Sequence, residues 1–354
     1  MTIYRTALPT STGFIEVGDG LPTHLIAEIG LNHNGSEELA RDMIRAAALS
    51  GATFVKFQKR SPADLATAAF LDAPFEKCPA MGRTQREVRE RLELPLAVYR
   101  RLREYAESLG LVFFASAFDL PSLAFLREAG VTIIKLASHS LTNGPLLQEV
   151  ARQQLPVIIS LGGSTPEEQA RAVAHLADNP LVLLHCVSAY PTPDHMATLD
   201  TIAVLRERFQ KPVGFSSHEV GIDISAASSI LGACMIERHF TLNRAMVGLD
   251  QGISLEPAEF ADLAQCIRRL RAARGVSAGL HESEKVAKHA YHVAVCTRQA
   301  LPPGTEITRE MLVCKQPLID PAHYFTGLEL EAVIGRRTRI DLAGDSAISR
   351  EALE

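Results

Sequence analysis

Two histidines stand at the ends of two short apolar runs in the second half of the chain. His218 follows the run 212–217, and His239 lies in the run 235–240. The segment 222–232 between them is rich in Ala, Ile and Leu and suits a packed helix. A strand–helix–strand unit of this length favours a right-handed parallel crossover, which places both imidazoles at the carboxyl ends of neighbouring strands. Such a pair can share one divalent ion, with water or substrate at its other positions; the alternative is a pair of hydrogen-bonded core histidines.

Carboxylates accompany this pair. Glu237 precedes His239 by two residues, so both side chains fall on one face of the strand. Asp250 follows in a loop that is expected to rim the same end of the sheet. On the first predicted strand, Glu28 is the candidate for proton transfer or for contact with a metal-bound water.

Lysines inside apolar strands are costly to bury unless they meet an anion, yet Lys56 and Lys135 both occupy such strands. A salt bridge to a core carboxylate such as Glu28 would be a purely structural explanation, and recognition of an anionic substrate is the functional one. Hydroxyl groups recur at the same depth, at or near the strand ends: Ser116, Ser138, Ser160, Ser188 and Ser216. With the lysines they predict a cradle for phosphate and carboxylate oxygens, suited to an aldolase, an isomerase or a phosphate-releasing condensation.

The elements that must position these residues alternate along the chain. Each of eight predicted strands is followed by a helical pattern, and the strands span 24–31, 54–58, 112–117, 133–138, 157–161, 181–187, 212–217 and 235–240. This count predicts a closed (β/α)8 TIM barrel. The alternative is an open doubly wound sheet, but no GxGxxG follows the first strand. The connection 60–94 exceeds normal loop lengths and is expected to fold over the barrel mouth.

The pattern changes after a last amphipathic helix at 257–274. We predict a barrel domain over 1–280, a linker over 281–291 and a small β-rich domain over 292–354. A domain of this size buries little core by itself, so it is expected to dock on another surface.

Bulk properties exclude several classes of protein. The chain has 354 residues, is 47% hydrophobic and carries a formal net charge of -5 without basic clusters, which predicts no nucleic-acid surface. Its apolar runs stay short of the roughly 18 residues that a membrane span needs. Residues 1–20 lack the layout of a signal peptide, so the sequence predicts a cytoplasmic protein that does not enter a membrane.

Several motifs, in order, closely resemble the sialic acid synthase family of the N-acetylneuraminate synthase type. They are AEIGLNHNG (27–35), VKFQ (55–58), KLAS (135–138), LLHCVSAYPTP (183–193), GFSSH (214–218) and IERHFTL (236–242). GTEITREML (304–312) and GRRTRIDLAGDSAI (335–348) resemble that family's antifreeze-like SAF domain, a β-clip fold. The resemblance covers nearly the whole chain.

This resemblance implies condensation of phosphoenolpyruvate with an open-chain N-acyl hexosamine, such as N-acetylmannosamine, to give a nine-carbon 2-keto-3-deoxy sugar acid and phosphate. It implies Mn²⁺ or Mg²⁺ held by His218 and His239, which would polarise the aldehyde oxygen. The catalytic residues would be Glu28, Lys56, Lys135 and Glu237. Phosphoenolpyruvate would contact Lys56, Ser116, Lys135, Ser138, Ser160, Ser188 and Ser216, and the sugar would contact Gln58, Tyr190, Asp250 and Gln316. A domain-swapped homodimer, in which the small domain covers the partner's barrel, is also implied.

Departures from the family pattern concern the sugar. Gln316 stands where the family usually has the arginine of Lys-Arg-Pro, and an amide does not replace a guanidinium fork. His139 and Ser140 follow KLAS, where an acid is common two residues on, and many relatives have Asn at Ser188. A 2,4-diacetamido-trideoxyhexose, the acceptor of a legionaminate or pseudaminate synthase, therefore stays open. Alternatives from other classes are a Schiff-base aldolase using Lys135 and a non-catalytic sugar- or ice-binding module.

Overall fold

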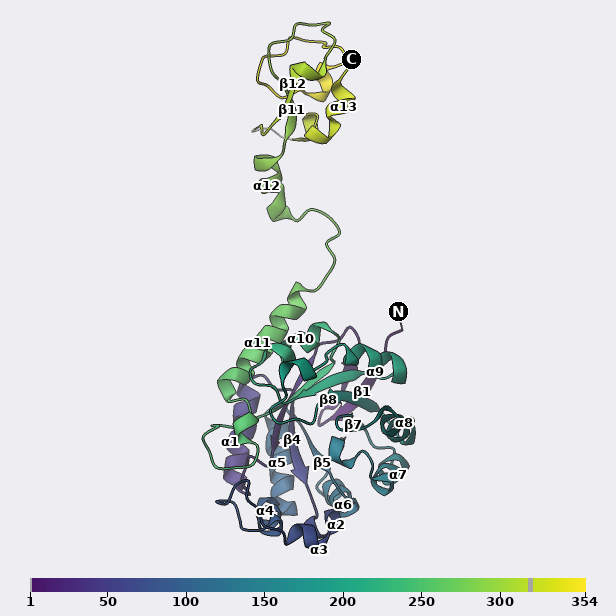
Figure 1. Cartoon of the computed structure of the whole chain (residues 1–354), viewed down its shortest axis with the longest axis vertical. Helices are drawn as coiled ribbons and strands as arrows, with labels where there is room; N and C mark the ends of the chain where they lie inside the picture. The colour runs from purple at the N-terminus through teal and green to yellow at the C-terminus, as the bar shows by residue number, and fades with distance from the viewer. Residues whose placement is uncertain (1, 318–320) are drawn as a thin grey trace. The chain divides into compact units, whose positions relative to one another are not determined.

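The computed structural model describes residues 2–317 and 321–354. It divides into two compact units, one ending at Arg274 and the other beginning at Gly275 (Figure 1). The boundary lies a little before the one predicted at residue 280. The segment 281–291, expected to be a linker, contains the helix α12 (Glu282–Tyr291).

The first unit is a closed barrel of parallel strands, as predicted. Its strands pair in the order β10-β3-β4-β5-β6-β7-β8-β9, so the last strand closes against the first. Their bounds are β3 (His24–Gly30), β4 (Phe54–Lys59), β5 (Val112–Ala117), β6 (Ile134–Leu136), β7 (Val157–Ser160), β8 (Leu181–Cys186), β9 (Val213–Ser217) and β10 (Met235–His239). The strand predicted to reach Ser138 ends at Leu136, because Ser138 already begins a 3-10 turn.

Helices follow the strands and cover the outside of the barrel (Figure 1). The main ones are α1 (Glu37–Leu49), α5 (Leu96–Ser108), α6 (Leu120–Glu128), α7 (Gly144–Arg152), α8 (Pro166–His175), α9 (Thr201–Phe209), α10 (Asp223–Ile230) and α11 (Pro257–Ala273). Capping residues in the sequence fix where several begin. Ser36, for example, accepts a hydrogen bond from the Leu39 amide at 3.1 Å and starts α1.

A hairpin that the sequence analysis did not predict precedes the barrel. It pairs β1 (Arg5–Thr10) with β2 (Gly13–Gly18) in antiparallel register. Leu8 and Val17 are fully buried in the barrel core. The hairpin is tied to the outer helix α9, because Asp19 accepts a hydrogen bond of 2.6 Å from Arg206.

Inward-facing side chains change character along each strand, and β4 shows the pattern. Phe54, Lys56 and Gln58 follow one another along its inner face, since side chains two residues apart lie on the same face of a strand. The first of them is apolar and the other two are polar. Phe54 packs edge-on against Phe114 of β5, with ring centroids 5.9 Å apart, and fills the barrel interior. Apolar packing thus supports a polar layer above it, at the carboxyl ends of the strands.

The long connection after β4 folds over this polar end, as predicted. It is not a plain loop, because it contains α2 (Pro62–Leu65), α3 (Ala68–Leu71) and α4 (Gln85–Leu92). Its Met81, Val88 and Leu92 form a small buried cluster with Leu31, which follows β3. This cluster holds the connection against the loop that leaves the first barrel strand.

The second unit has a small core of its own, which includes Val295, Ile307, Phe325 and Ile348. Its regular strands are β11 (Ala294–Thr297) and β12 (Leu312–Lys315), which pair antiparallel, and its second short helix is α13 (Leu330–Val333). Isolated bridges join the remaining segments. The unit is therefore β-rich, as predicted, and its assignment as an antifreeze-like domain stays a prediction.

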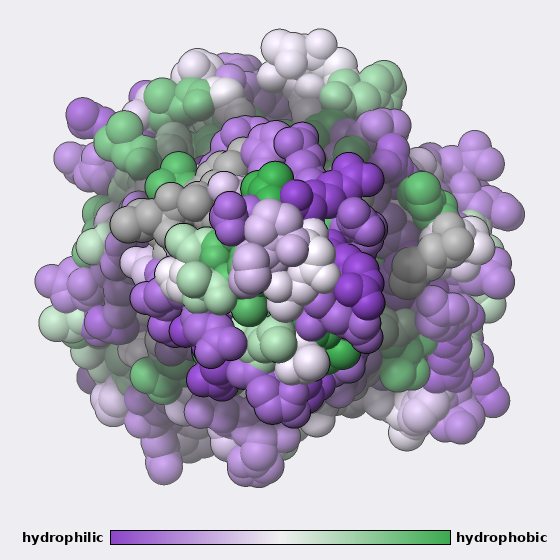
Figure 2. All heavy atoms as spheres, turned by 90° about the horizontal axis from the view of Figure 1, so that it is seen from above, coloured by the Kyte–Doolittle hydropathy of each residue, from purple (hydrophilic) through white to green (hydrophobic). Residues whose placement is uncertain are grey.

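The surface is mixed in polarity. Figure 2 shows hydrophilic side chains over most of the face in view, with apolar side chains scattered among them. Among the described residues, every helix is too short or too polar to cross a membrane.

Candidate active site

A cavity of about 560 Å³ opens at the carboxyl ends of the barrel strands. Its volume is typical of a small-molecule site. All the site residues that were predicted within the barrel line it: Glu28, Lys56, Gln58, Ser116, Lys135, Ser138, Ser160, Ser188, Tyr190, Ser216, His218, Glu237, His239 and Asp250. The fold thus brings together residues from all the barrel strands, while their individual roles stay predictions.

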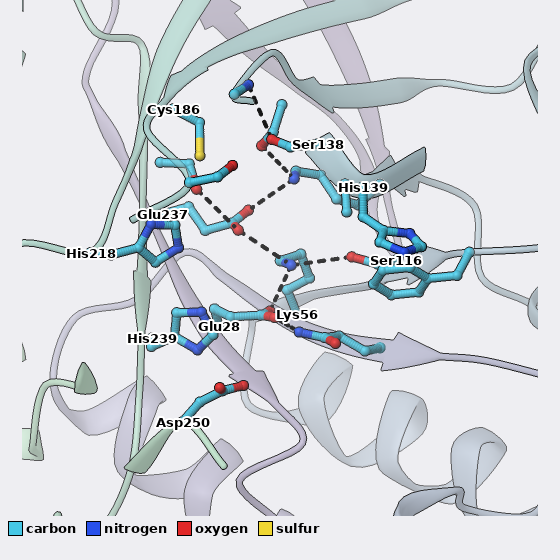
Figure 3. Close-up of a pocket in the computed structure, with 18 of the residues that line it drawn as sticks. Glu28, Lys56, Ser116, Ser138, His139, Cys186, His218, Glu237, His239 and Asp250 are labelled. Atoms are coloured by element: carbon cyan, nitrogen blue, oxygen red, sulfur yellow. Dashed lines mark hydrogen bonds and ion pairs between the residues drawn. The ribbon is translucent and has the colours of Figure 1, made fainter. Parts of the chain in front are cut away.

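Carboxylates and ammonium groups alternate in a buried network of ion pairs across the cavity floor (Figure 3). The Lys56 ammonium lies 2.8 Å from Glu28 Oε2 and 3.3 Å from Glu237 Oε1. Lys135 lies 3.8 Å from the other oxygen of Glu237. The structural explanation considered for Lys56, a salt bridge to Glu28, is therefore present, and the same ammonium also faces the cavity.

Burial and neighbouring charges set the ionisation of this network. Burial opposes the charge of Glu237, but Lys135 and Lys56 outweigh it and lower the pKa of Glu237 to about 2. Burial also disfavours the charged form of Lys56, yet Glu237 and Glu28 raise its pKa. For Lys135, burial prevails over the attraction of Glu237 and lowers the pKa. The floor thus places the Glu237 carboxylate between two ammonium groups, one of which also pairs with Glu28.

Hydroxyl groups surround the two ammonium groups. Lys56 donates to Ser116 Oγ at 3.2 Å, and Lys135 donates to Ser160 Oγ at 2.7 Å. Ser138 Oγ accepts from the Gly162 amide at 3.1 Å. A side chain at Gly162 would meet the Ser138 and Ser188 hydroxyls within about 3 Å, so this corner stays open only because residue 162 is glycine. Such a cradle of hydroxyls and ammonium groups suits phosphate or carboxylate oxygens.

The predicted histidine pair lies beside this network. The imidazole centroids of His218 and His239 are 5.4 Å apart. His218 Nδ1 donates to the Val187 carbonyl at 3.1 Å, which leaves its Nε2 as the acceptor or ligand nitrogen. Burial lowers the pKa of His218 to about 3, so the ring is neutral.

These two residues fit a divalent metal in their chemistry. Both rings line the cavity, and His239 Nδ1 is buried without a hydrogen-bond partner in the described part of the chain. Within residues 2–317 and 321–354, no group of three His, Cys, Asp or Glu side chains is spaced to hold an ion by itself. A metal at this pair would therefore need water or substrate to complete its coordination.

Predicted sugar contacts lie around the same mouth. Gln58 donates to Glu28 Oε1 at 2.6 Å, and the Tyr190 ring lies over His218 with centroids 4.1 Å apart. Asp250 begins the turn that rims the cavity. Gln316 belongs to the second unit, so its predicted contact with the sugar stays a prediction.

Sequence reasoning missed several cavity residues. Arg60, Arg89, Phe118 and Cys186 line the cavity, as does His139, which the sequence analysis named only as a departure from the family pattern. The period of two could have found some of them, because Arg60 continues the inward row of Lys56 and Gln58. Arg89 comes from α4, and nothing in its local pattern points to the cavity.

A second buried ion pair supports both histidine-bearing strand ends. Arg238, next to His239, donates to Glu219 Oε1 at 2.6 Å, and Glu219 directly follows His218. Glu219 also accepts from Ser225 at the start of α10. This pair fixes the backbone on either side of the imidazoles.

The chain is similar in sequence to several known proteins. Residues 43–278 match the NeuB family. N,N'-diacetyllegionaminic acid synthase of Legionella pneumophila is 33% identical over 346 residues, which cover 95% of this chain and 96% of the relative. Human N-acetylneuraminate-9-phosphate synthase is 32% identical over 342 residues, which cover 96% and 94%.

A solved structure shows the same likeness. N-acetylneuraminic acid (sialic acid) synthetase from Leptospira borgpetersenii, crystallised with citrate, aligns with a TM-score of 0.67 at 32% identity and covers 80% of this chain and 96% of its own. The match spans well over half of the chain and extends to relatives along almost their full length. The chain belongs to the NeuB family of sialic acid synthases.

Proposed function

We propose that this enzyme condenses phosphoenolpyruvate with an open-chain N-acyl hexosamine, such as N-acetylmannosamine, to form a nine-carbon 2-keto-3-deoxy sugar acid and phosphate. Family membership supports condensation with phosphoenolpyruvate. The observation that carries the proposal is the buried network of two lysines and two glutamates beside the histidine pair. It supplies anion recognition and proton transfer within one cavity.

Phosphoenolpyruvate matches the lower layer of the cavity. Its carboxylate and phosphate need cations and hydroxyl donors, which Lys56, Lys135 and the surrounding serines provide. Gly162 leaves room for an oxygen between Ser138 and Ser188. Burial of both lysines strengthens each charge-assisted bond, because few waters compete for them.

In the proposed reaction, C3 of phosphoenolpyruvate forms a bond to the aldehyde carbon of the sugar, whose oxygen takes a proton. A water molecule adds to C2, and the C2–phosphate bond breaks to give the ketone and inorganic phosphate. Glu28 is placed to orient or deprotonate that water, because its carboxylate is held by Lys56 and Gln58 at the cavity floor. Glu237 offers one carboxylate oxygen to each of the two ammonium groups.

A divalent metal, Mn²⁺ or Mg²⁺, would be held by His218 and His239 and would supply Lewis-acid polarisation of the aldehyde oxygen. Val187 orients His218 for this role, through the hydrogen bond to Nδ1.

The acceptor is proposed as N-acetylmannosamine, with a 2,4-diacetamido-trideoxyhexose as the alternative. Relatives named for legionaminic, neuraminic and pseudaminic acids all match this chain. We further propose a homodimer in which the second unit covers the partner's cavity and presents Gln316 to the sugar.

A Schiff-base aldolase is the second candidate. The lowered pKa of Lys135 favours it, since an imine forms from the neutral amine. Borohydride would trap the protein covalently with a keto acid in that case, and Lys135→Met would abolish the trapping. Untrapped protein would exclude this chemistry.

The main test measures phosphate release from phosphoenolpyruvate in the presence of Mn²⁺, with a panel of hexosamines and with or without EDTA. Sugar-dependent release that EDTA stops would support the proposal and identify the acceptor. Absence of release with every sugar would refute the proposed condensation.

A further inference from the structure

A guanidinium group in the cavity wall binds the amide that holds the Glu28 carboxylate. Arg60, which directly follows β4, donates to Gln58 Oε1 at 2.5 Å. Gln58 Nε2 donates in turn to Glu28 Oε1 at 2.6 Å. All three side chains line the cavity. They form a hydrogen-bonded series that runs from the end of β4 to the neighbouring strand β3.

Arg60 decides which way the Gln58 amide faces. A guanidinium carries only hydrogen-bond donors, so the part of the amide that meets it is the oxygen. The NH2 group of Gln58 is then left to face Glu28, and it donates to that carboxylate. Because the Lys56 ammonium lies 2.8 Å from the other oxygen, both oxygens of Glu28 face donors that are held in place. Each oxygen keeps a further lone pair, which can accept from a water molecule.

Strand β3 is shaped around this contact. Its pairing with β4 shifts in register between Glu28 and Gly30. Gly30 has a φ of +53°, and a Cβ atom at this position would lie 2.9 Å from Glu28 Oε1 and 3.1 Å from Gln58 Nε2. A side chain would therefore press on the two atoms that form the hydrogen bond. Glycine leaves the space in which Gln58 and Glu28 meet.

Arg60 is itself held by its surroundings. Its backbone amide donates to Glu93 Oε1 at 3.2 Å, and Glu93 pairs with the Lys59 ammonium at 2.6 Å. The guanidinium lies over the Phe118 ring, with Cζ 4.7 Å from the ring centre. Backbone and side chain are thus both anchored, so the donor that faces Gln58 is preorganised.

We infer that Arg60 is a positioning residue for the condensation: it orients the Gln58 amide, and this amide holds Glu28 as an acceptor for the attacking water. The inference rests on the proposed function and on the role given there to Glu28. Without the Arg60 donor, the amide is free to turn and to place its oxygen against the carboxylate, where two acceptors repel. Gln58 thereby gains a second task, and its NH2 group keeps one hydrogen for the sugar.

The test measures phosphate release by Arg60→Met, which fills the space of the side chain but has no donor. The assay contains phosphoenolpyruvate, Mn²⁺ and N-acetylmannosamine, or the hexosamine that the wild-type panel identifies. We expect kcat to fall about 10- to 100-fold, because Glu28 is misplaced. The KM for phosphoenolpyruvate should stay within about twofold, since Lys56 and Lys135 keep their serine partners.

Two further substitutions separate positioning from a general loss of charge. Arg60→Lys restores a donor and should recover most of the lost kcat. Arg86→Gln removes a guanidinium from a surface pair with Asp72 on α4 and should behave as wild type. A kcat that Arg60→Met leaves unchanged would overturn the inference, as would a rise in the KM for phosphoenolpyruvate in place of the fall in kcat.

A double-mutant cycle tests the route through Gln58. If Arg60 acts through this amide, Arg60→Met should lower kcat no further in a Gln58→Leu background. Additive losses would overturn the inference. Arg60→Met should fold, because Glu93 keeps both Lys59 and the backbone amide of residue 60 as partners, and urea unfolding checks this. Arg60→Gln, with a shorter polar side chain, repeats the cycle if the methionine variant does not fold.

Crystal structures give an answer that does not depend on turnover. In Arg60→Met, the Glu28 and Gln58 side chains should leave their wild-type positions or occupy two conformers, and Arg60→Lys should restore them. Unmoved side chains in Arg60→Met would overturn the inference and leave the condensation intact. Absence of phosphate release by the wild type with every sugar would refute the condensation, and the crystal structures would then decide on the positioning of Glu28 by Arg60.

Discussion

The ammonium group of Lys56 lies 2.8 Å from Oε2 of Glu28, inside the barrel. Both side chains are buried, and Gln58 occupies the other oxygen of Glu28. The carboxylate is therefore held in one orientation at the floor of the cavity, which is what a residue that positions a water molecule requires.

Replacing Glu28 by Gln should separate binding from chemistry. Glu237 still neutralises Lys56 in this variant, so binding of phosphoenolpyruvate should persist, while turnover falls by about 10²- to 10⁴-fold. Binding is measured by calorimetry and turnover by phosphate release. Glu37→Gln, at the exposed start of α1, is the matched control and should behave as wild type. Undiminished turnover in Glu28→Gln would remove Glu28 from the mechanism.

The histidine pair makes a prediction that does not depend on activity. His218→Ala and His239→Ala should each weaken Mn²⁺ binding by more than about tenfold, because each removes one of the two imidazole ligands. Titration followed by electron paramagnetic resonance measures this directly. His195→Ala, at an exposed position, serves as the control. Unchanged affinity in both variants would show that the metal, if bound, lies elsewhere.

The Glu219–Arg238 pair should contribute strongly to stability. Glu219→Gln leaves a buried guanidinium unpaired and should lower the free energy of unfolding by about 3–5 kcal/mol. Glu37→Gln breaks a solvent-screened surface ion pair and should lower the free energy of unfolding far less. Urea unfolding followed by circular dichroism suits this chain, which has no tryptophan. Adding Arg238→Met to Glu219→Gln should recover part of the loss, and equal losses in the buried and exposed variants would contradict this account.

His33 should make stability depend on pH. Burial lowers its pKa from 6.5 to about 4, and its Nδ1 accepts a hydrogen bond from the Gly35 amide at 3.0 Å. Between these values the unfolded chain binds a proton that the folded chain does not, so stability rises with pH and falls on acidification, by at most about 3 kcal/mol. His33→Gln should flatten this part of the urea-unfolding profile between pH 7 and 4. A profile as steep as that of wild type, or equal flattening by His195→Gln, would argue against His33.

Much of the fold could be predicted from the sequence, because parallel barrel strands are buried on both faces and appear as continuous apolar runs. Their number and alternation with helices indicated the barrel, and the polar residues at their ends indicated the cavity. The hairpin of β1 and β2 was missed, since the two central residues of its turn, Ser11 and Thr12, are neither Gly nor Asn, and Pro9 lies within the first strand.

Tertiary structure decided which of these residues meet. Glu28 and Glu237 are far apart in the sequence, yet both contact Lys56, because β10 closes the barrel against β3 and places His239 opposite Glu28. Arg89 reaches the cavity from a separate helix, so no periodicity along a strand could have indicated it. The sequence determined the residue types and the strand faces through local patterning. Closure of the barrel and packing of the connection between β4 and α5 decided which charged side chains become neighbours. Those contacts join segments that are far apart in the sequence, and no local pattern links them.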